Sequence, residues 1–295
     1  MNQSIKNIVE ANIDNQYQIS RFLRHNQLVY RHLDWLDSID WLGKQPYLLS
    51  ISDRDIQAVI CAASEIEFAS WIRLFGVRDD LQLVEFWNCL LNKSIKYLQT
   101  MKYQHLMALA TQHWFAKLLE TSGFVNLQTI IILEWKSELQ INTQFSGEMK
   151  IRPMQYYDLE EIRTLDKNAF SYEWQISLNE LHKALNHKGH NTVAVHRDNV
   201  VGYLISTISP YNAHLARLAV NPQFQRRGIA SGLLSDFLTQ IKNNQIKQVT
   251  VNTQADNKPS IKLYQRFGFQ RTSQTIPVWE LNIENLHKDS VIGKL

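Results

Sequence analysis

One stretch in the second half of the sequence has the residue types and spacing of an anion-binding loop. Residues 218–231 read LAVNPQFQRRGIAS, in which an apolar strand leads through a turn into the start of a helix. A helix N-terminus presents unpaired backbone N–H groups and the positive end of the helix dipole. Small residues there let the backbone approach an anion, and cationic side chains add to the attraction. The small residues are Gly228, Ala230 and Ser231, and the cations are Arg226 and Arg227. The stretch therefore predicts a pyrophosphate site.

A second stretch, residues 257–269 (NKPSIKLYQRFGF), predicts a short capped helix. Asn257 suits the N-cap, Pro259 the first turn and Gly268 the left-handed C-terminal position. Capping alone therefore accounts for these three residues. It does not account for Tyr264, which lies inside the helix.

Together the two stretches resemble the two signatures of the GNAT superfamily of N-acetyltransferases. The first matches Q/R-x-x-G-x-G/A through Gln225, Gly228 and Ala230, and the second matches N-x-x-[AS]-x-x-L-Y-x-x-x-G-F. The resemblance covers about residues 150–281 and is greatest for the branch that contains the ribosomal-protein N-terminal acetyltransferases. Three further elements of that branch occur here in order: IRPM at 151–154, DL at 158–159 and AFSYEW at 169–174.

The resemblance implies acetyl-CoA as the acyl donor and assigns residues to its binding. The backbone of Leu218, Ala219 and Val220 would pair with the pantetheine arm, and Asn257 would also contact the cofactor. The pyrophosphate would lie on Gln225, Arg226, Arg227, Gly228, Ile229, Ala230 and Ser231. Tyr264 would contact the cofactor and act as the acid beside its sulfur. The sequence predicts no metal site.

The sequence departs from that branch at the general base. Members of the branch often carry a Glu five residues before the motif Asn, and this chain has Asn252 there. An amide is not a base at neutral pH. Three alternatives stay open: Asn252 orders a water with His214 drawing the proton away, Glu173 draws it away instead, or the amine arrives already neutral.

The residues around these motifs predict an α/β domain with a mixed, mostly antiparallel sheet flanked by helices. Strands are expected at 149–154, 192–196, 200–206, 215–220, 247–253 and 275–281. Helices are expected at 159–170, 179–185, 228–241 and 259–267.

The first half of the sequence repeats landmarks of the second at a nearly constant spacing. AKLLETSGF at 116–124 aligns with IKLYQRFGF at 261–269, and Arg73 with Arg217. Leu90-Leu91 and Leu233-Leu234 also align, as do Glu134 and Glu280. We interpret the chain as a tandem duplication of GNAT-type domains.

The first copy lacks the residues that would carry chemistry. Opposite the anion-binding loop, residues 77–85 read VRDDLQLVE, with no glycine and three acids that would repel a phosphate. Leu119 stands where Tyr264 stands in the second copy. This copy is not expected to bind acetyl-CoA; it would pack on the other copy or wall the acceptor cleft.

A polar stretch divides the two copies. The predicted division is a degenerate GNAT-like domain without the acetyl-CoA motif at 1–136, a linker at 137–148, and a catalytic N-acetyltransferase domain at 149–295. At about 150 residues per domain, a length of 295 agrees with two domains.

Composition excludes several other classes of protein. Only 10 Gly and 6 Pro argue against a disordered or fibrous chain, and no apolar run approaches the about 18 residues of a membrane span. With 31 Lys and Arg against 28 Asp and Glu, the net charge of +3 is too small to indicate nucleic-acid binding. Cys61 and Cys89 have no metal or redox spacing, and four histidines between 182 and 196 lack the i,i+4 spacing of a zinc pair.

The sequence thus predicts a cytoplasmic enzyme, monomeric or homodimeric, without membrane or nucleic-acid partners. It would transfer acetyl from acetyl-CoA to a primary amine of a protein N-terminus, a lysine or a small molecule. Both cysteines lie in the first half, so direct transfer in a ternary complex is favoured over an acyl-enzyme. The alternative is a non-catalytic acyl-CoA sensor or scaffold, which Asn252 and the degenerate copy would suit.

Overall fold

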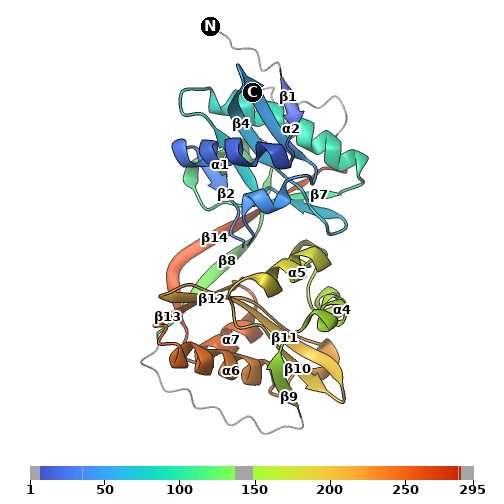
Figure 1. The fold of residues 1–295 in the computed structure, drawn as a ribbon, viewed down its shortest axis with the longest axis vertical. Coiled ribbons are helices and arrows are strands. Elements are labelled where there is room, and N and C mark those ends of the chain that lie inside the picture. The colour runs from blue at the N-terminus through green and yellow to red at the C-terminus, as the bar shows by residue number, and fades with distance from the viewer. Residues whose placement is uncertain (1–6, 35, 137–148, 285, 287–295) are drawn as a thin grey trace. The chain divides into compact units, whose positions relative to one another are not determined.

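The structure, a computed structural model, describes residues 7–34, 36–136, 149–284 and 286 (Figure 1). The predicted linker at 137–148 lies outside the described residues. Contacts divide the chain into two compact units: unit 1 holds residues 1–128 and 276–295, and unit 2 holds residues 129–275. Among the helices of the described segments, none is both long enough and apolar enough to cross a membrane.

Unit 2 is an α/β fold whose sheet has the strand order β8-β13-β12-β11-β10-β9. Its strands are β9 (Lys150–Pro153), β10 (Thr192–His196), β11 (Asn199–Ile208), β12 (Asn212–Val220) and β13 (Gln248–Gln254), with the end of β8 (Val125–Lys136). Its helices are α4 (Leu159–Ala169), α5 (Leu178–Asn186), α6 (Ile229–Asn243) and α7 (Lys258–Arg266). Within the described residues of this unit, β12 and β13 pair in parallel, and the other neighbouring strands pair antiparallel. The predicted elements of the second half all occur.

Unit 1 repeats this order of elements with two differences: the strand β2 stands where unit 2 has α5, and the strands β5 and β6 stand where unit 2 has β12. Its strands are β1 (Ile8–Glu10), β2 (Val29–Arg31), β3 (Tyr47–Ser52), β4 (Asp55–Cys61), β5 (Ala69–Trp71), β6 (Leu74–Val77) and β7 (His105–Leu109). Its helices are α1 (Gln16–His25), α2 (Leu83–Thr100) and α3 (His113–Thr121). In the parallel pair β5–β7, Ala69 lies opposite His105. In the parallel pair β12–β13, Asn212 lies opposite Gln248, and both residues are 143 positions after their counterparts in unit 1. The tandem architecture predicted from the repeat is therefore present in the fold.

The final strand of each half lies in the unit of the other half. β8 ends the first half, yet its residues 130–136 pair antiparallel with β13 of unit 2. β14 (Gln270–Asn282) ends the second half, yet its residues 278–282 pair antiparallel with β7 of unit 1. The compact units therefore differ from the sequence-based domains 1–136 and 149–295 at these strands. Pairing explains the difference, because a strand belongs to the sheet that satisfies its backbone hydrogen bonds.

Side-chain alternation fixes the two faces of the unit 2 sheet. Ile131, Leu133 and Trp135 of β8 are fully buried in a core that also contains Val249 and Val251 of β13. The core continues through Ala213, Leu215 and Leu204 to the apolar side of α6. Because successive residues of a strand point to opposite faces, the residues between these belong to the face away from α6. Tyr203, beside Leu204, lies on that face, and so does Arg217, which follows a bulge after Leu215; both contact Asp166 of α4.

Candidate functional site

The predicted anion-binding loop has the backbone geometry that an anion requires. β12 ends at Val220, a short turn follows at 222–224, and α6 begins at Ile229. Gly228 is the N-cap of α6 with φ of 81°, and Arg226 has φ of 60°. No side chain caps the helix start. A Cβ added to Gly228 would meet no atom within 4 Å. The first N–H groups of α6 therefore face open space behind a left-handed glycine.

Two neighbouring strands part beside this loop. The parallel pairing of β12 with β13 ends at Leu215 and Val251. Leu218, Ala219 and Val220 lie past that point and keep backbone pairing with β11 on their other edge. The structure thus places the three residues predicted to pair with pantetheine where an edge of β12 has no partner from β13. An extended ligand can add to such an edge as a strand would.

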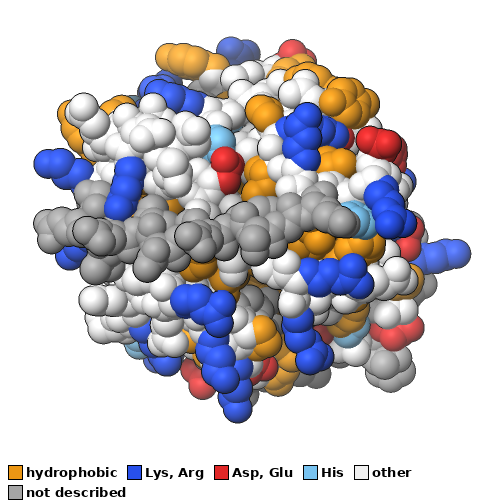
Figure 2. Space-filling view, turned by 90° about the horizontal axis from the view of Figure 1, so that it is seen from below, with side chains coloured by type: hydrophobic (Ala, Val, Ile, Leu, Met, Phe, Trp, Pro, Cys, Tyr) orange, Lys and Arg blue, Asp and Glu red, His pale blue; other side chains and the backbone are white. Residues whose placement is uncertain are grey.

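Exposed basic residues occur on the loop and on α7. Arg226 and Arg227 are exposed, and the Arg227 guanidinium lies 5.0 Å from the centre of the Phe224 ring. Exposed basic residues also recur every four positions along α7, at Lys258, Lys262 and Arg266. Figure 2 shows one face of the molecule, on which Lys and Arg side chains are spread among polar and apolar ones. The exposed Arg226 and Arg227 favour an anionic ligand near the start of α6.

The second motif forms α7 as predicted. Asn257 caps the helix, its Oδ1 accepting from the Ser260 N–H at 3.2 Å, and this leaves the carboxamide NH₂ for a ligand. Tyr264 is 6% exposed and packs against Phe269, with ring centres 5.6 Å apart. Burial raises the pKa of the Tyr264 phenol, so the hydroxyl keeps its proton at neutral pH. No hydrogen bond to this hydroxyl occurs within the described part of the chain.

The face of the sheet away from α6 carries the candidates for the proton acceptor. His214 Nδ1 lies 2.9 Å from Thr250 Oγ1 of the neighbouring strand. Burial lowers the pKa of His214, so the imidazole is neutral at pH 7. A neutral imidazole that donates its Nδ1–H to Thr250 keeps a lone pair on Nε2. Asn252 lies two residues from Thr250 on the same face. Glu173 accepts from the Ser171 hydroxyl at 2.7 Å on the connection between α4 and α5.

A buried charged cluster that the sequence analysis did not single out fixes that connection. Asp166 of α4 is fully buried and accepts from Arg217 Nε at 2.6 Å, from the Tyr203 hydroxyl and from the Ile176 N–H at 3.0 Å. Arg217 also donates to the Trp174 carbonyl and lies 4.0 Å from the centre of the Phe170 ring. The sequence does contain a signal for this cluster: Asp166 is an acid on the apolar stripe of an amphipathic helix, where it follows Leu159, Ile162 and Leu165.

Replacing Asp166 by Asn is expected to lower the free energy of unfolding by about 3–5 kcal/mol, because it leaves the buried Arg217 without its counter-charge. The control is Glu160→Gln, which removes the exposed i,i+3 partner of Arg163 and should cost at most about 1 kcal/mol. Urea unfolding followed by far-UV circular dichroism measures both. Equal midpoints for the two variants would contradict a structural role for the cluster.

In the corresponding loop of unit 1, the acidic side chains accept hydrogen bonds from other residues of unit 1. Asp79 Oδ1 accepts the N–H groups of Gln27 and Leu28 at 3.0 and 3.2 Å, and Arg78 Nε donates to Asp80 at 2.9 Å. Leu119, in the place of Tyr264, is fully buried. The loop therefore holds two carboxylates and no glycine between β6 and α2.

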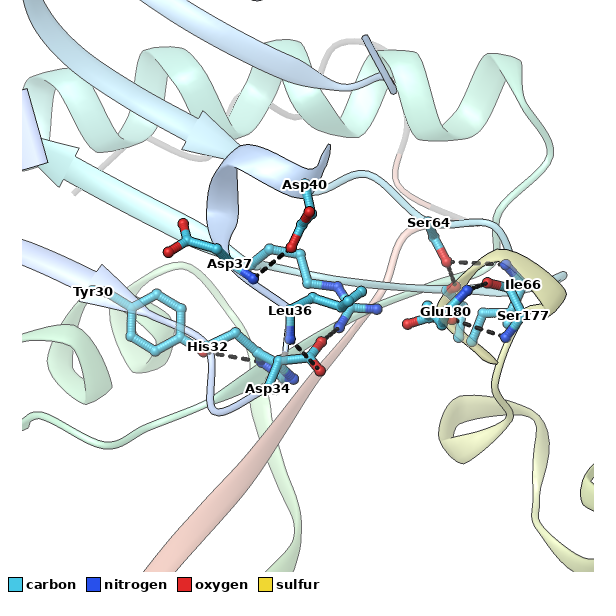
Figure 3. Close-up of polar contacts among 12 residues, drawn as sticks. Tyr30, His32, Asp34, Leu36, Asp37, Asp40, Ser64, Ile66, Ser177 and Glu180 are labelled. Atoms are coloured by element: carbon cyan, nitrogen blue, oxygen red, sulfur yellow. Dashed lines mark hydrogen bonds and ion pairs between the residues drawn. The ribbon is translucent and has the colours of Figure 1, made fainter. Parts of the chain in front are cut away.

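Unit 1 contains a cavity of about 200 Å³ that the sequence analysis did not anticipate. It is lined by Arg31, His32, Asp34, Leu36, Asp37, Ser38, Trp41 and Arg73. Arg73 pairs with Asp34 at 2.6 Å and lies 4.4 Å from the centre of the Trp41 ring. Burial and the nearby Arg73 hold the pKa of His32 well below its usual range. Figure 3 shows Tyr30 of β2 and, on the segment that follows this strand, His32 and Asp34. None of the predicted site residues lines this cavity.

Residues 159–269 match the family model described as the Acetyltransferase (GNAT) family. The spore coat polysaccharide biosynthesis protein SpsD of Bacillus subtilis is 37% identical over 79 residues, which are 27% of this chain and 27% of that protein. The [ribosomal protein bS18]-alanine N-acetyltransferase of Salmonella typhimurium is 28% identical over 76 residues, 26% of this chain and 51% of that enzyme. The chain thus spans about a quarter to a half of the length of these relatives.

A solved tandem GNAT protein from the clavulanic acid biosynthesis pathway resembles the whole fold. Its TM-score is 0.68 at 12% identity, with 94% of this chain and 98% of that chain covered. At this identity the likeness concerns the fold alone. The fold is that of two successive GNAT-type domains.

Proposed function

Because the second half of this chain belongs to the GNAT acetyltransferase family, we propose that unit 2 transfers the acetyl group of acetyl-CoA to a primary amine. One observation carries the proposal: the uncapped start of α6 adjoins the place where β12 and β13 part. The loop provides donors for a pyrophosphate, and the open strand edge provides a path for an extended amide-bearing arm.

The residues assigned to acetyl-CoA fit these two features. In the proposal, the backbone of Leu218, Ala219 and Val220 holds the arm. The diphosphate lies on the segment Gln225, Arg226, Arg227, Gly228, Ile229, Ala230 and Ser231. Asn257 contributes its carboxamide NH₂ and Tyr264 its hydroxyl. Unit 1 has no counterpart of this arrangement in its loop at 77–85, so we propose one cofactor site per chain.

We propose direct transfer in a ternary complex. Acetyl-CoA supplies the activated acetyl group, whose bond to sulfur breaks as the bond to the amine nitrogen forms. The Tyr264 hydroxyl gives its proton to the departing sulfur, and the raised pKa of Tyr264 keeps that proton available at neutral pH. His214 Nε2 takes the proton of the amine, because its neutral state at pH 7 leaves a lone pair there. Asn252 and Glu173 remain the alternatives for ordering a water or receiving that proton.

The acceptor is an amine of a protein N-terminus, a lysine or a small molecule. The similarity to the [ribosomal protein bS18]-alanine N-acetyltransferase supports a protein N-terminus as the acceptor. The second candidate function is a non-catalytic acyl-CoA sensor. It is favoured by Asn252, an amide where related enzymes have a carboxylate.

Consumption of acetyl-CoA distinguishes an acetyltransferase from a non-catalytic acyl-CoA sensor. We expect the purified chain to release free thiol from acetyl-CoA in the presence of primary amines, as followed with a thiol reagent. The panel contains an N-terminal alanine peptide, a lysine peptide and a diamine, with the N-acetylated alanine peptide as the blocked control. Binding of acetyl-CoA without thiol release from any amine would contradict the enzyme and support the sensor.

A further inference from the structure

Three polar residues form one row on the face of the unit 2 sheet that lies away from α6. The register places Glu134 of β8 opposite Thr250 of β13, and Thr250 opposite His214 of β12. All three alternate with core residues, since Leu133 and Trp135 flank Glu134 and both are fully buried against α6. They therefore share the face away from α6.

Glu134 lies within side-chain reach of Thr250 and Asn252 on the neighbouring strand. Side chains directly opposite on neighbouring strands have Cβ atoms about 4.5–5.5 Å apart, and diagonal neighbours about 7–8 Å, which long side chains span. Glu134 is directly opposite Thr250, the partner of His214, and diagonal to Asn252, which pairs with Ile132. Its carboxylate thus lies on the same face of the sheet as Asn252 and His214.

The carboxylate of Glu134 is accessible to a cation. Its side chain is 25% exposed, and its ion pair is with Lys136 at 3.5 Å, whose side chain is 73% exposed. Exposed pairs of this kind contribute little free energy, because water and salt screen them. The ammonium group of a ligand can therefore replace Lys136 beside Glu134 with little loss of free energy.

We infer that Glu134 binds the protonated amine of the acceptor and holds it beside His214. The inference rests on the function proposed above and adds a specificity residue to it. Acceptor amines are largely protonated at neutral pH, so a carboxylate on their path favours their approach. The ammonium then gives its proton to His214 Nε2 before the nitrogen attacks. The strand that carries Glu134 comes from the half of the sequence without the acetyl-CoA motif.

The test compares Glu134→Gln with Glu280→Gln. Glu280 is the counterpart of Glu134 on β14, where it pairs with His105 Nδ1 at 2.6 Å in unit 1. For Glu134→Gln we expect the KM for the amine to rise at least about tenfold, with the KM for acetyl-CoA unchanged. Glu134→Asp should restore part of the affinity. Glu280→Gln should keep both values of the wild type.

A second readout does not depend on turnover. Saturation-transfer NMR of butylammonium with the CoA-bound protein should show contact for the wild type and for Glu280→Gln, and loss of contact for Glu134→Gln. An unchanged amine KM, or an unchanged NMR signal, in Glu134→Gln would overturn the role of Glu134. Absence of thiol release by the wild type would instead overturn the proposed function, and the NMR comparison would still decide the inference.

Discussion

Replacing Gly228 by Glu is expected to abolish the stabilisation of the protein by acetyl-CoA. A ligand that binds only the folded state adds about 2.7 kcal/mol to stability at a hundredfold excess over its Kd. The added Cβ meets no atom within 4 Å, so the new carboxylate would project into the space in front of α6. There it repels a diphosphate and competes for the N–H groups of the helix start. Thermal unfolding with and without acetyl-CoA measures the loss.

Unit 1 offers a matched control. Gly43 has φ of 84° and nothing within 4 Å of an added Cβ, so Gly43→Glu carries the same backbone strain and the same charge. It should keep the full thermal shift. Calorimetric titration should give one site per chain for the wild type and Gly43→Glu, and none for Gly228→Glu. A full response of Gly228→Glu, or two sites per chain, would refute the assignment of the cofactor site.

Replacing Tyr264 by Phe is expected to lower kcat by about 10²- to 10⁴-fold, the range for loss of a general acid. The ring and its contact with Phe269 remain, so folding and the affinity for acetyl-CoA should be preserved. The loss should be at least tenfold even where water donates in part. Single-turnover measurements of thiol release isolate the chemical step from product release.

Tyr47→Phe is the control for loss of a buried hydroxyl. Tyr47 is fully buried in unit 1, and burial raises its pKa as it does that of Tyr264. This variant should turn over at the wild-type rate. If Tyr264→Phe does so as well with chemistry rate-limiting, the proton reaches the sulfur from another donor.

Local patterns predicted the elements of unit 2 to within a few residues. The apolar stripe from Ile229 and the cap at Gly228 mark α6, and the caps Asn257 and Gly268 mark α7. These signals are local because a cap or a stripe is satisfied within one or two turns. The binding residues predicted from the same motifs lie at the end of β12, on the loop and first turn of α6, and on α7.

The partners of β8 and β14 could not be predicted in this way. Both strands have a similar alternating pattern, so the sequence near Glu134 does not indicate which strand lies beside it. Asp166 and Arg217 were missed for the same reason. They are 51 positions apart, and only the packing of α4 on the sheet joins them.

Because β14 pairs with β7 of unit 1, the sheet of unit 1 is completed only when the end of the chain has been synthesised. β7 ends at Leu109, but its partner on β14 begins at Val278. At about 5–20 residues per second, a ribosome needs on the order of ten seconds or more to bridge that gap. During this time the edge of β7 has unpaired N–H and C=O groups, which invite pairing with other chains. The first domain to emerge is therefore the last to be completed, and a nascent chain stalled before residue 278 leaves it open to aggregation.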